Sequence, residues 1–112
     1  MKVKLGEQFI SQQTRLANNP ISRMIGLMFK KEMKNYDGLL IRPCNSIHTF
    51  FMRFSIDAVF LNKDFKVIRI YRDLKPWRMT TIIWKANQVL ELRAGTLPDN
   101  VKEGDSLTVC TN

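Results

Sequence analysis

Residues 46–61, SIHTFFMRFSIDAVFL, constrain the fold of this chain more than any other stretch. They form the longest run rich in aromatic and β-branched residues, the residue types that β-strands favour. We predict two strands within the run, at 47–52 and 56–62, separated by Arg53, Phe54 and Ser55. Both faces of the second strand are apolar apart from Asp57, which predicts a central strand and a largely buried carboxyl group.

The flanking sequence predicts further short strands. Residues 65–71 alternate in polarity after a turn at 62–64, so they are expected to form a hairpin with 56–62. More short strands are expected within 2–10 and at 13–17, 38–42, 88–93 and 107–109. Most of the chain is therefore expected to be extended.

One helix is predicted near the N-terminus. Asn19 and Pro20 form a helix-start signal, because Asn accepts hydrogen bonds from free amides and Pro suits the first helical position. Apolar residues then follow at helical spacing, namely Ile21, Met24, Ile25 and Met28. The pattern predicts one clear α-helix over about 20–28.

The element pattern and the length together predict the fold class. A chain of 112 residues normally forms one domain, so we expect a single domain over 1–112. About seven short strands with one helix predict a mainly β fold, a small β-sandwich or a partly closed barrel. Cys44 and Cys110 are too few for a disulfide-built scaffold, and we expect both thiols to be free.

The formal net charge is +8, from 18 Lys and Arg against 10 Asp and Glu. Such a balance raises the affinity for polyanions such as nucleic acid or anionic lipid, although a solvated surface explains scattered basic residues as well. No segment approaches ~18 consecutive apolar residues, so no transmembrane helix is expected. The start lacks a signal-peptide core, which predicts the cytoplasm if the chain begins as printed, and the periplasm or export if a leader was removed.

Asp57 is the candidate catalytic residue. A buried carboxylate is costly unless it is paired, and Arg23 and Arg53 are candidate partners. The functional interpretation is an enzyme of unknown class, in which Asp57 acts as a base while an arginine binds an anionic substrate. The structural interpretation is an acid that organises a turn or anchors an arginine, and we favour it because structural networks also bury acids.

Cys44, His48 and Met52 follow one another at intervals of four residues. On a continuous strand they would share a face, and these residue types bind copper in soft metal sites. A second histidine is missing from the sequence, so we expect neither a metal nor another cofactor. A catalytic pair of Cys44 and His48 is also disfavoured, since strand residues four apart lie about 13 Å from each other.

A further pattern combines aromatic and basic residues. Trp77 and Trp84 flank an irregular segment that contains Arg78. Such a segment suits stacking on bases and contacts with phosphates. A half-buried loop with cations reaching to solvent explains the pattern more simply, and we favour this interpretation.

Several sequence blocks resemble one known family. The blocks are Arg23-x-x-Gly26-Leu27-Met28, then residues 38–41, 47–61 and 89–95, then Gly104-Asp105. Over about 14–109 the chain resembles the prokaryotic family called domain of unknown function 192, or uncharacterised protein family 0127. The resemblance implies a small, mainly β domain without an established activity. Many members carry an export signal or a membrane anchor, and a common branch lacks the histidine, which implies that His48 does not carry a shared activity alone.

We therefore hypothesise a non-enzymatic binding or accessory domain that acts on an envelope component or a protein partner. The candidate ligand-binding or motif residues are Arg23, Met28, His48, Met52, Arg53 and Asp57. The alternatives are the enzyme that uses Asp57 and a weak binder of polyanions.

Overall fold

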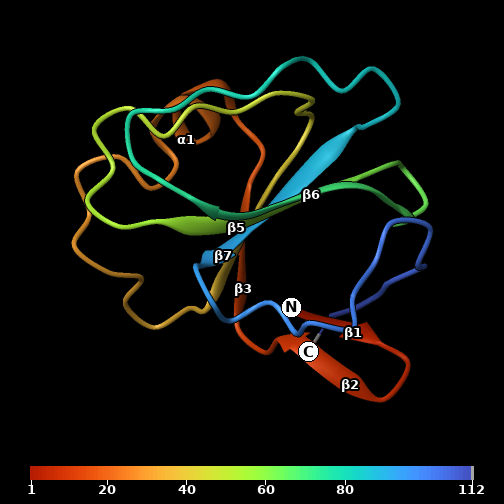
Figure 1. Cartoon of the computed structure of the whole chain (residues 1–112). Helices are drawn as coiled ribbons and strands as arrows, with labels where there is room; N and C mark the ends of the chain where they lie inside the picture. Colours follow the sequence, from red (N-terminus) through yellow and green to blue (C-terminus); the bar gives the residue numbers. More distant parts are fainter. Residues whose placement is uncertain (112) are drawn as a thin grey trace.

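The computed structural model describes residues 1–111 and contains eight strands and one short helix (Figure 1). The elements are β1 (Lys2–Leu5), β2 (Gln8–Ser11), β3 (Thr14–Ala17), α1 (Pro20–Ile25), β4 (Gly38–Ile41), β5 (Ile56–Leu61), β6 (Val67–Leu74), β7 (Gln88–Arg93) and β8 (Thr108–Cys110). They form a five-stranded sheet, β3-β4-β7-β5-β6, and a three-stranded sheet, β2-β1-β8. The predicted mainly β, sandwich-like fold is confirmed, and the two sheets are open rather than closed into a barrel.

The larger sheet is built around β5 and β7. Val59 of β5 pairs with Ile70 of β6 on one side and Leu90 of β7 on the other, which confirms the predicted hairpin and the central position of this strand. All six residues of β5 and all four of β4 are buried. Strands covered on both faces need apolar side chains in both directions, and these sequences supply them.

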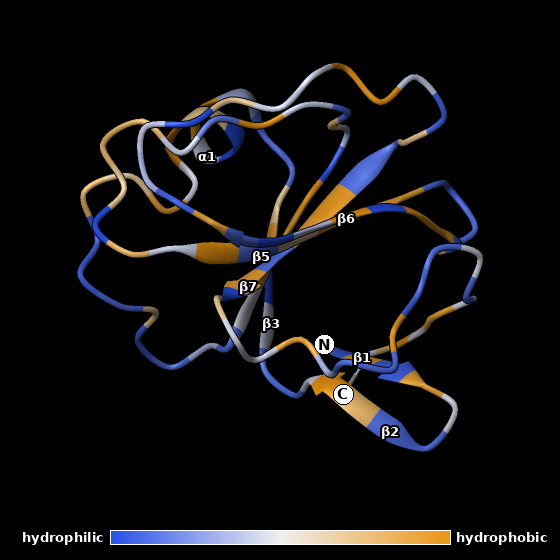
Figure 2. Ribbon diagram, in the orientation of Figure 1, coloured by the Kyte–Doolittle hydropathy of each residue, from blue (hydrophilic) through white to orange (hydrophobic). Residues whose placement is uncertain are grey.

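Two hydrophobic layers cover the two faces of this sheet. One face carries Ile56, Ala58 and Phe60 and packs against loop residues that include Ile47 and Met52. The opposite face carries Val59 and Leu61 and packs against Val3 and Ile10 of the smaller sheet. Figure 2 shows hydrophobic residues along β5 and β7, between these two layers.

The helix begins as predicted and ends earlier. The Asn19 side chain accepts a hydrogen bond from the Ser22 amide at 2.8 Å, and Pro20 follows it. Gly26 then adopts a φ of 48° and ends α1 after Ile25, so the predicted boundary at 28 was wrong. Within residues 1–111, no helix has the length and apolar character that a membrane crossing requires.

The predicted strand at 47–52 was also wrong. Residues 47–49 contact residues 78–80 through backbone hydrogen bonds and a single bridge between His48 and Met79, and residues 50 and 51 form a turn, so no regular strand forms here. The Met52 amide donates back to the Thr49 carbonyl at 3.2 Å, and Phe51 has a left-handed φ of 64°. Both features bend the chain, so Cys44, His48 and Met52 do not share the face of a strand.

Candidate functional site

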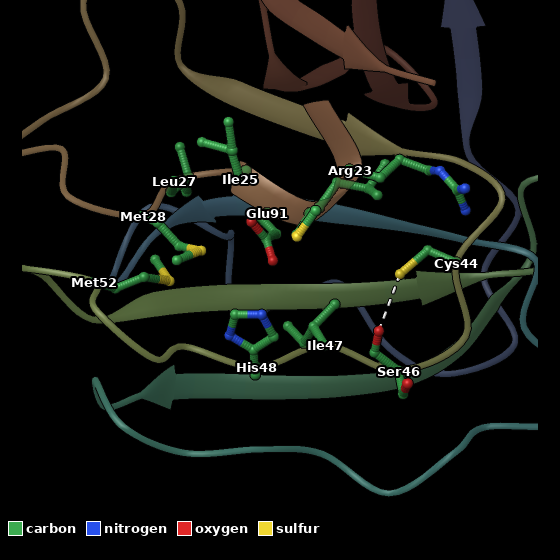
Figure 3. Close-up of a pocket in the computed structure, with 13 residues that line it drawn as sticks. Arg23, Ile25, Leu27, Met28, Cys44, Ser46, Ile47, His48, Met52 and Glu91 are labelled. Carbon is green, nitrogen blue, oxygen red and sulfur yellow. Dashed lines mark hydrogen bonds between the residues drawn. The ribbon is translucent and has the colours of Figure 1, made fainter. Parts of the chain in front are cut away.

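A cavity of about 70 Å³ lies between α1 and the five-stranded sheet (Figure 3). Its walls come from residues 23–28 at the end of α1 and from the segment 44–52, and its floor comes from β4 and β7. Nine of its 13 lining residues belong to the sequence blocks that carry the family resemblance: Arg23, Gly26, Leu27, Met28, Ile41, Ile47, His48, Met52 and Glu91. The fold therefore gathers separate parts of the signature around one space.

Glu91 lies at the floor of the cavity. It is only 3% exposed and sits in β7 between Leu39 of β4 and Ala58 of β5. Among residues 1–111, no side chain forms an ion pair with its carboxyl group and no donor forms a hydrogen bond with it. Figure 3 shows the carboxyl group at the centre of the lining side chains. The small Ala58 side chain beside it leaves the carboxyl group room on this face of the sheet.

Burial raises the pKa of Glu91 to about 8, because the cavity offers no partner that replaces the lost hydration. The group is therefore mostly a neutral carboxylic acid at pH 7. In that form it donates one hydrogen bond through its hydroxyl and accepts others through its carbonyl oxygen. A ligand that enters the cavity meets a hydrogen-bonding group that no protein partner occupies.

His48 forms part of the cavity wall. Its Nδ1 accepts a hydrogen bond from the Phe50 amide at 3.2 Å, and its ring stacks on the Phe50 ring with centroids 5.0 Å apart. A neutral imidazole whose Nδ1 accepts carries its proton on Nε2. While this hydrogen bond persists, the free side of the ring offers an N–H donor rather than a lone pair for a metal ion.

Arg23 and Cys44 lie at another side of the cavity. Arg23 Nη1 donates to the Pro43 carbonyl at 3.0 Å, while its buried Nε has no hydrogen-bond partner among residues 1–111. Cys44 is free, and its thiol donates to the Ser46 carbonyl at 3.1 Å rather than to His48. Burial raises the pKa of the Cys44 thiol, and the nearby Glu91 carboxylate raises it further. The structure therefore shows no activated pairing of this cysteine with the histidine.

The structure brings together four of the six sequence-predicted site residues. Arg23, Met28, His48 and Met52 all line the cavity, although they come from two different segments. Arg53 is exposed and does not line it. Together with Met24, the two methionines give the cavity flexible apolar walls.

Asp57 lies apart from the cavity, on the opposite face of the sheet. Its carboxylate is 2% exposed and accepts hydrogen bonds from the amides of Asp73 at 2.9 Å, Gly95 at 3.0 Å and Leu97 at 3.1 Å. These contacts join β5 to the end of β6 and to the turn after β7. The surroundings match the structural interpretation of this acid, with backbone amides in place of an arginine.

Glu91 is the site residue that sequence reasoning missed. A charged residue in the alternating strand QVLELR normally faces solvent. The only available signal was that the neighbouring predicted strands 38–42 and 56–62 are apolar on both faces. A strand between two such neighbours is buried on both sides, including at its charged position.

Comparisons with known proteins agree with the resemblance seen in the sequence. The model of the family DUF192, described as "Uncharacterized ACR", matches residues 1–109. A UPF0127 protein from Pyrococcus horikoshii is 38% identical over 95 residues, which cover 80% of this chain and 79% of that protein.

Two solved structures are similar to this chain. A protein of unknown function from Novosphingobium aromaticivorans has a TM-score of 0.78 at 19% identity, covering 96% of this chain and 82% of that one, and it shows a shared fold. A candidate transcription regulator from Sinorhizobium meliloti has a TM-score of 0.73 at 25% identity, covering 85% of this chain and 79% of that one.

Proposed function

This chain belongs to the DUF192 family, whose description assigns no activity, and from its own geometry we propose that it is a binding domain rather than an enzyme. The proposed ligand is small, or is a small group of a larger partner, and it enters the cavity to form a hydrogen bond with Glu91. The four motif residues Arg23, Met28, His48 and Met52 would then line a binding site.

The single observation that carries this proposal is the unpartnered carboxyl group of Glu91. A buried polar group left without a hydrogen bond costs about 1–3 kcal/mol, and folded proteins rarely leave one unpaired. This group faces a cavity instead of packed side chains. The Glu91 oxygens keep some access to the cavity, since the fully buried side-chain atoms without a partner among residues 1–111 are Arg23 Nε, Arg42 Nε and Gln88 Oε1. A ligand that supplies a hydrogen bond to this carboxyl group therefore recovers at most that free energy on binding.

The donors in the cavity indicate the chemistry of the ligand. The neutral Glu91 carboxyl group and the Nε2–H of His48 both offer hydrogen bonds to an oxygen acceptor. The three methionine side chains suit the apolar carbon atoms next to such an oxygen. A neutral carbonyl or amide group of a few heavy atoms fits both the donors and the small volume.

Acetamide is a direct probe of this site. Of the six methionines, Met24, Met28 and Met52 line the cavity whereas Met1, Met33 and Met79 do not. With isotope-labelled methionine methyl groups, the three methionines of the cavity therefore report binding by NMR, and the other three serve as controls in the same spectrum. We expect saturable shifts of the cavity methyl groups with a millimolar dissociation constant, about −4 kcal/mol.

Two comparisons make the test decisive. Glu91→Leu should abolish the acetamide shifts, because it removes the hydrogen-bonding group and keeps the site apolar. Methylammonium should leave the cavity signals unchanged at pH 6, where Glu91 is neutral. Binding of methylammonium but not acetamide, or the absence of any saturable shift, overturns the proposal.

A second candidate function is the binding of polyanions, which the distribution of charge favours. The segments 20–34, 50–54 and 75–85 carry eight of the 18 Lys and Arg and only one of the 10 Asp and Glu. They therefore hold a formal net charge of +7 out of +8. Ten basic residues lie elsewhere, where nine acidic residues nearly balance them, so the excess of positive charge is found on these three segments. The segments run along the upper and left sides of Figure 1.

A heparin column tests this second function. We expect retention that falls steeply between about 50 mM and 200 mM salt, because each basic group that contacts a polyanion releases counterions on binding. The absence of retention at the lower salt concentration would dismiss it.

A further inference from the structure

Three exposed aromatic side chains form a cluster on the charged side of the molecule. Phe29, Phe51 and Trp77 are 65%, 46% and 56% exposed. The Phe29 and Phe51 ring centroids lie 5.2 Å apart, and those of Phe51 and Trp77 lie 4.7 Å apart. The cluster joins three segments that are distant in sequence, and we call it the aromatic cluster.

All three residues of the aromatic cluster have a strained backbone. Their φ angles are 65° for Phe29, 64° for Phe51 and 64° for Trp77, in the left-handed region that bulky residues rarely adopt. The Phe29 amide donates to the Phe51 carbonyl at 2.9 Å, and the Trp77 amide donates to the Thr49 carbonyl at 3.0 Å, so neighbouring loops fix these conformations. Asn35, Phe65 and Asp73 share this conformation outside the cluster, so the strain supports a surface role only together with the exposure of the three rings.

Aliphatic side chains extend the exposed apolar surface around the cluster. Five isoleucine and methionine side chains on the same segments are exposed, namely Ile21, Met24, Ile25, Met79 and Ile82, and so is Trp84. The segment 75–85 is attached to the segment 44–52. The Thr80 amide donates to the Ile47 carbonyl, and a bridge joins Met79 to His48. Exposed apolar side chains that gather next to one another often mark an interaction site, and the contacts between the three aromatic rings show such a gathering.

We propose that this face docks on a lipid bilayer that contains anionic lipids, with Phe29, Phe51 and Trp77 entering the headgroup region. The inference rests on the second proposed function, the binding of polyanions, and identifies the polyanion as an anionic membrane surface. Aromatic side chains favour the bilayer interface, and basic residues beside them are attracted to anionic headgroups. The positive charge of these segments complements such a surface, and the exposed Ile and Met residues match acyl chains better than stacked bases.

Vesicle binding tests the proposal with the full chain. The vesicles contain phosphatidylcholine alone or with about 30% phosphatidylglycerol, and bound protein is measured by flotation. Both tryptophans of the chain, Trp77 and Trp84, are exposed, and Trp77 belongs to the aromatic cluster, so its fluorescence reports insertion directly. We expect at least about tenfold tighter partitioning onto the anionic vesicles, with a blue shift and quenching by brominated acyl chains.

Matched variants separate insertion from charge and from folding. Asn tolerates the left-handed conformation, so Phe29→Asn with Phe51→Asn should fold and bind vesicles at least about tenfold more weakly. Phe9→Ser is the control, since Phe9 is 41% exposed on the other sheet. Lys31→Glu with Lys34→Glu should weaken binding strongly, whereas Lys63→Glu with Lys66→Glu changes the net charge equally and should have a smaller effect.

The outcomes distinguish the general claim, that the chain binds polyanions, from the specific claim, that it docks on an anionic bilayer. Vesicle binding that depends on the aromatic cluster and on Lys31 and Lys34 supports the bilayer. Two results would overturn docking on a bilayer and leave polyanion binding. One is heparin retention without vesicle binding, and the other is tighter binding of an oligothymidine strand that depends on Trp77. Loss of both heparin and vesicle binding overturns both. If the two pairs of Lys→Glu substitutions weaken vesicle binding equally, the assignment of the binding surface to this face is overturned.

Discussion

Replacement of Glu91 by Gln tests the central feature of the cavity. The folded-state pKa of about 8 lies above the ordinary value of 4.5, so the folded chain keeps a proton that the unfolded chain releases between these pH values. The carboxyl group therefore leaves the stability intact below pH 4.5, reduces it progressively as the pH rises from 4.5 to 8, and has a constant effect above that. Gln has a similar shape and no ionisable proton, so Glu91→Gln removes this dependence.

The magnitude follows from the difference between the two pKa values. Each pH unit corresponds to about 1.4 kcal/mol, so Glu91 lowers the free energy of unfolding by about 3 kcal/mol at pH 7 and about 5 kcal/mol above pH 8. Glu91→Gln should match the wild type at pH 4.5 and be more stable by these amounts at higher pH. Such a gain is large for a chain whose total stability is about 5–15 kcal/mol.

Urea unfolding at a series of pH values measures this difference. Far-UV circular dichroism reports the transition, because both tryptophans are already exposed in the folded chain. Glu103→Gln is the control, since Glu103 is exposed. A constant difference between Glu91→Gln and the wild type from pH 4.5 to 9 would refute the reasoning. It would mean that Glu91 is ionised in the folded chain and paired, with Arg23 as the available cation in the same cavity.

Three further predictions concern other parts of the molecule. Asp57→Asn should lower the free energy of unfolding by about 3 kcal/mol in urea, because the amide group turns a donor toward backbone donors; unchanged stability would contradict its anchoring role. Phe51→Asn should stay within about 1 kcal/mol of the wild type, since relief of the left-handed strain offsets the lost ring contacts. Phe60→Asn, at a fully buried position, should cost several times more. A chain with Cys110→Ser should react with a thiol reagent at pH 8 at least about tenfold more slowly than one with Cys44→Ser, because burial shields Cys44 and raises its pKa.

Local sequence patterns predicted most strands because their pairing is local. The hairpin of β5 and β6 connects neighbouring alternating segments through a short turn, so its signal lies within about 20 residues. The segment 47–52 has the same composition but forms an irregular loop that contains one bridge and one turn. Its aromatic and β-branched residues reflect burial and not strand formation, since Thr49 is fully buried and Met52 is 5% exposed. Composition of this kind cannot separate a buried turn from a buried strand.

The cavity was less predictable because distant segments build it. The sequence marked Cys44, His48 and Met52 as neighbours, but the premise was a strand that does not exist. They share a cavity because the end of α1 packs over the turns that hold them. The candidate site residues chosen from the sequence included four that line the cavity, without their arrangement. Nothing in the sequence around Glu91 showed that its strand lies in the middle of the sheet.

The contrast between Asp57 and Glu91 explains why one acid is an anchor and the other is available to a ligand. Both lie on central strands, and Asp57 pairs with Leu92 while the adjacent Ala58 pairs with Glu91, so the two acids face opposite sides of one sheet. Asp57 stands near the start of β5, where the turn after β7 directs the free amides of Gly95 and Leu97 toward it. Glu91 stands within β7, where the neighbouring backbone amides are used in the pairing with β4 and β5. A carboxyl group at such a position finds no donor in its own sheet, so its partner has to come from the cavity side.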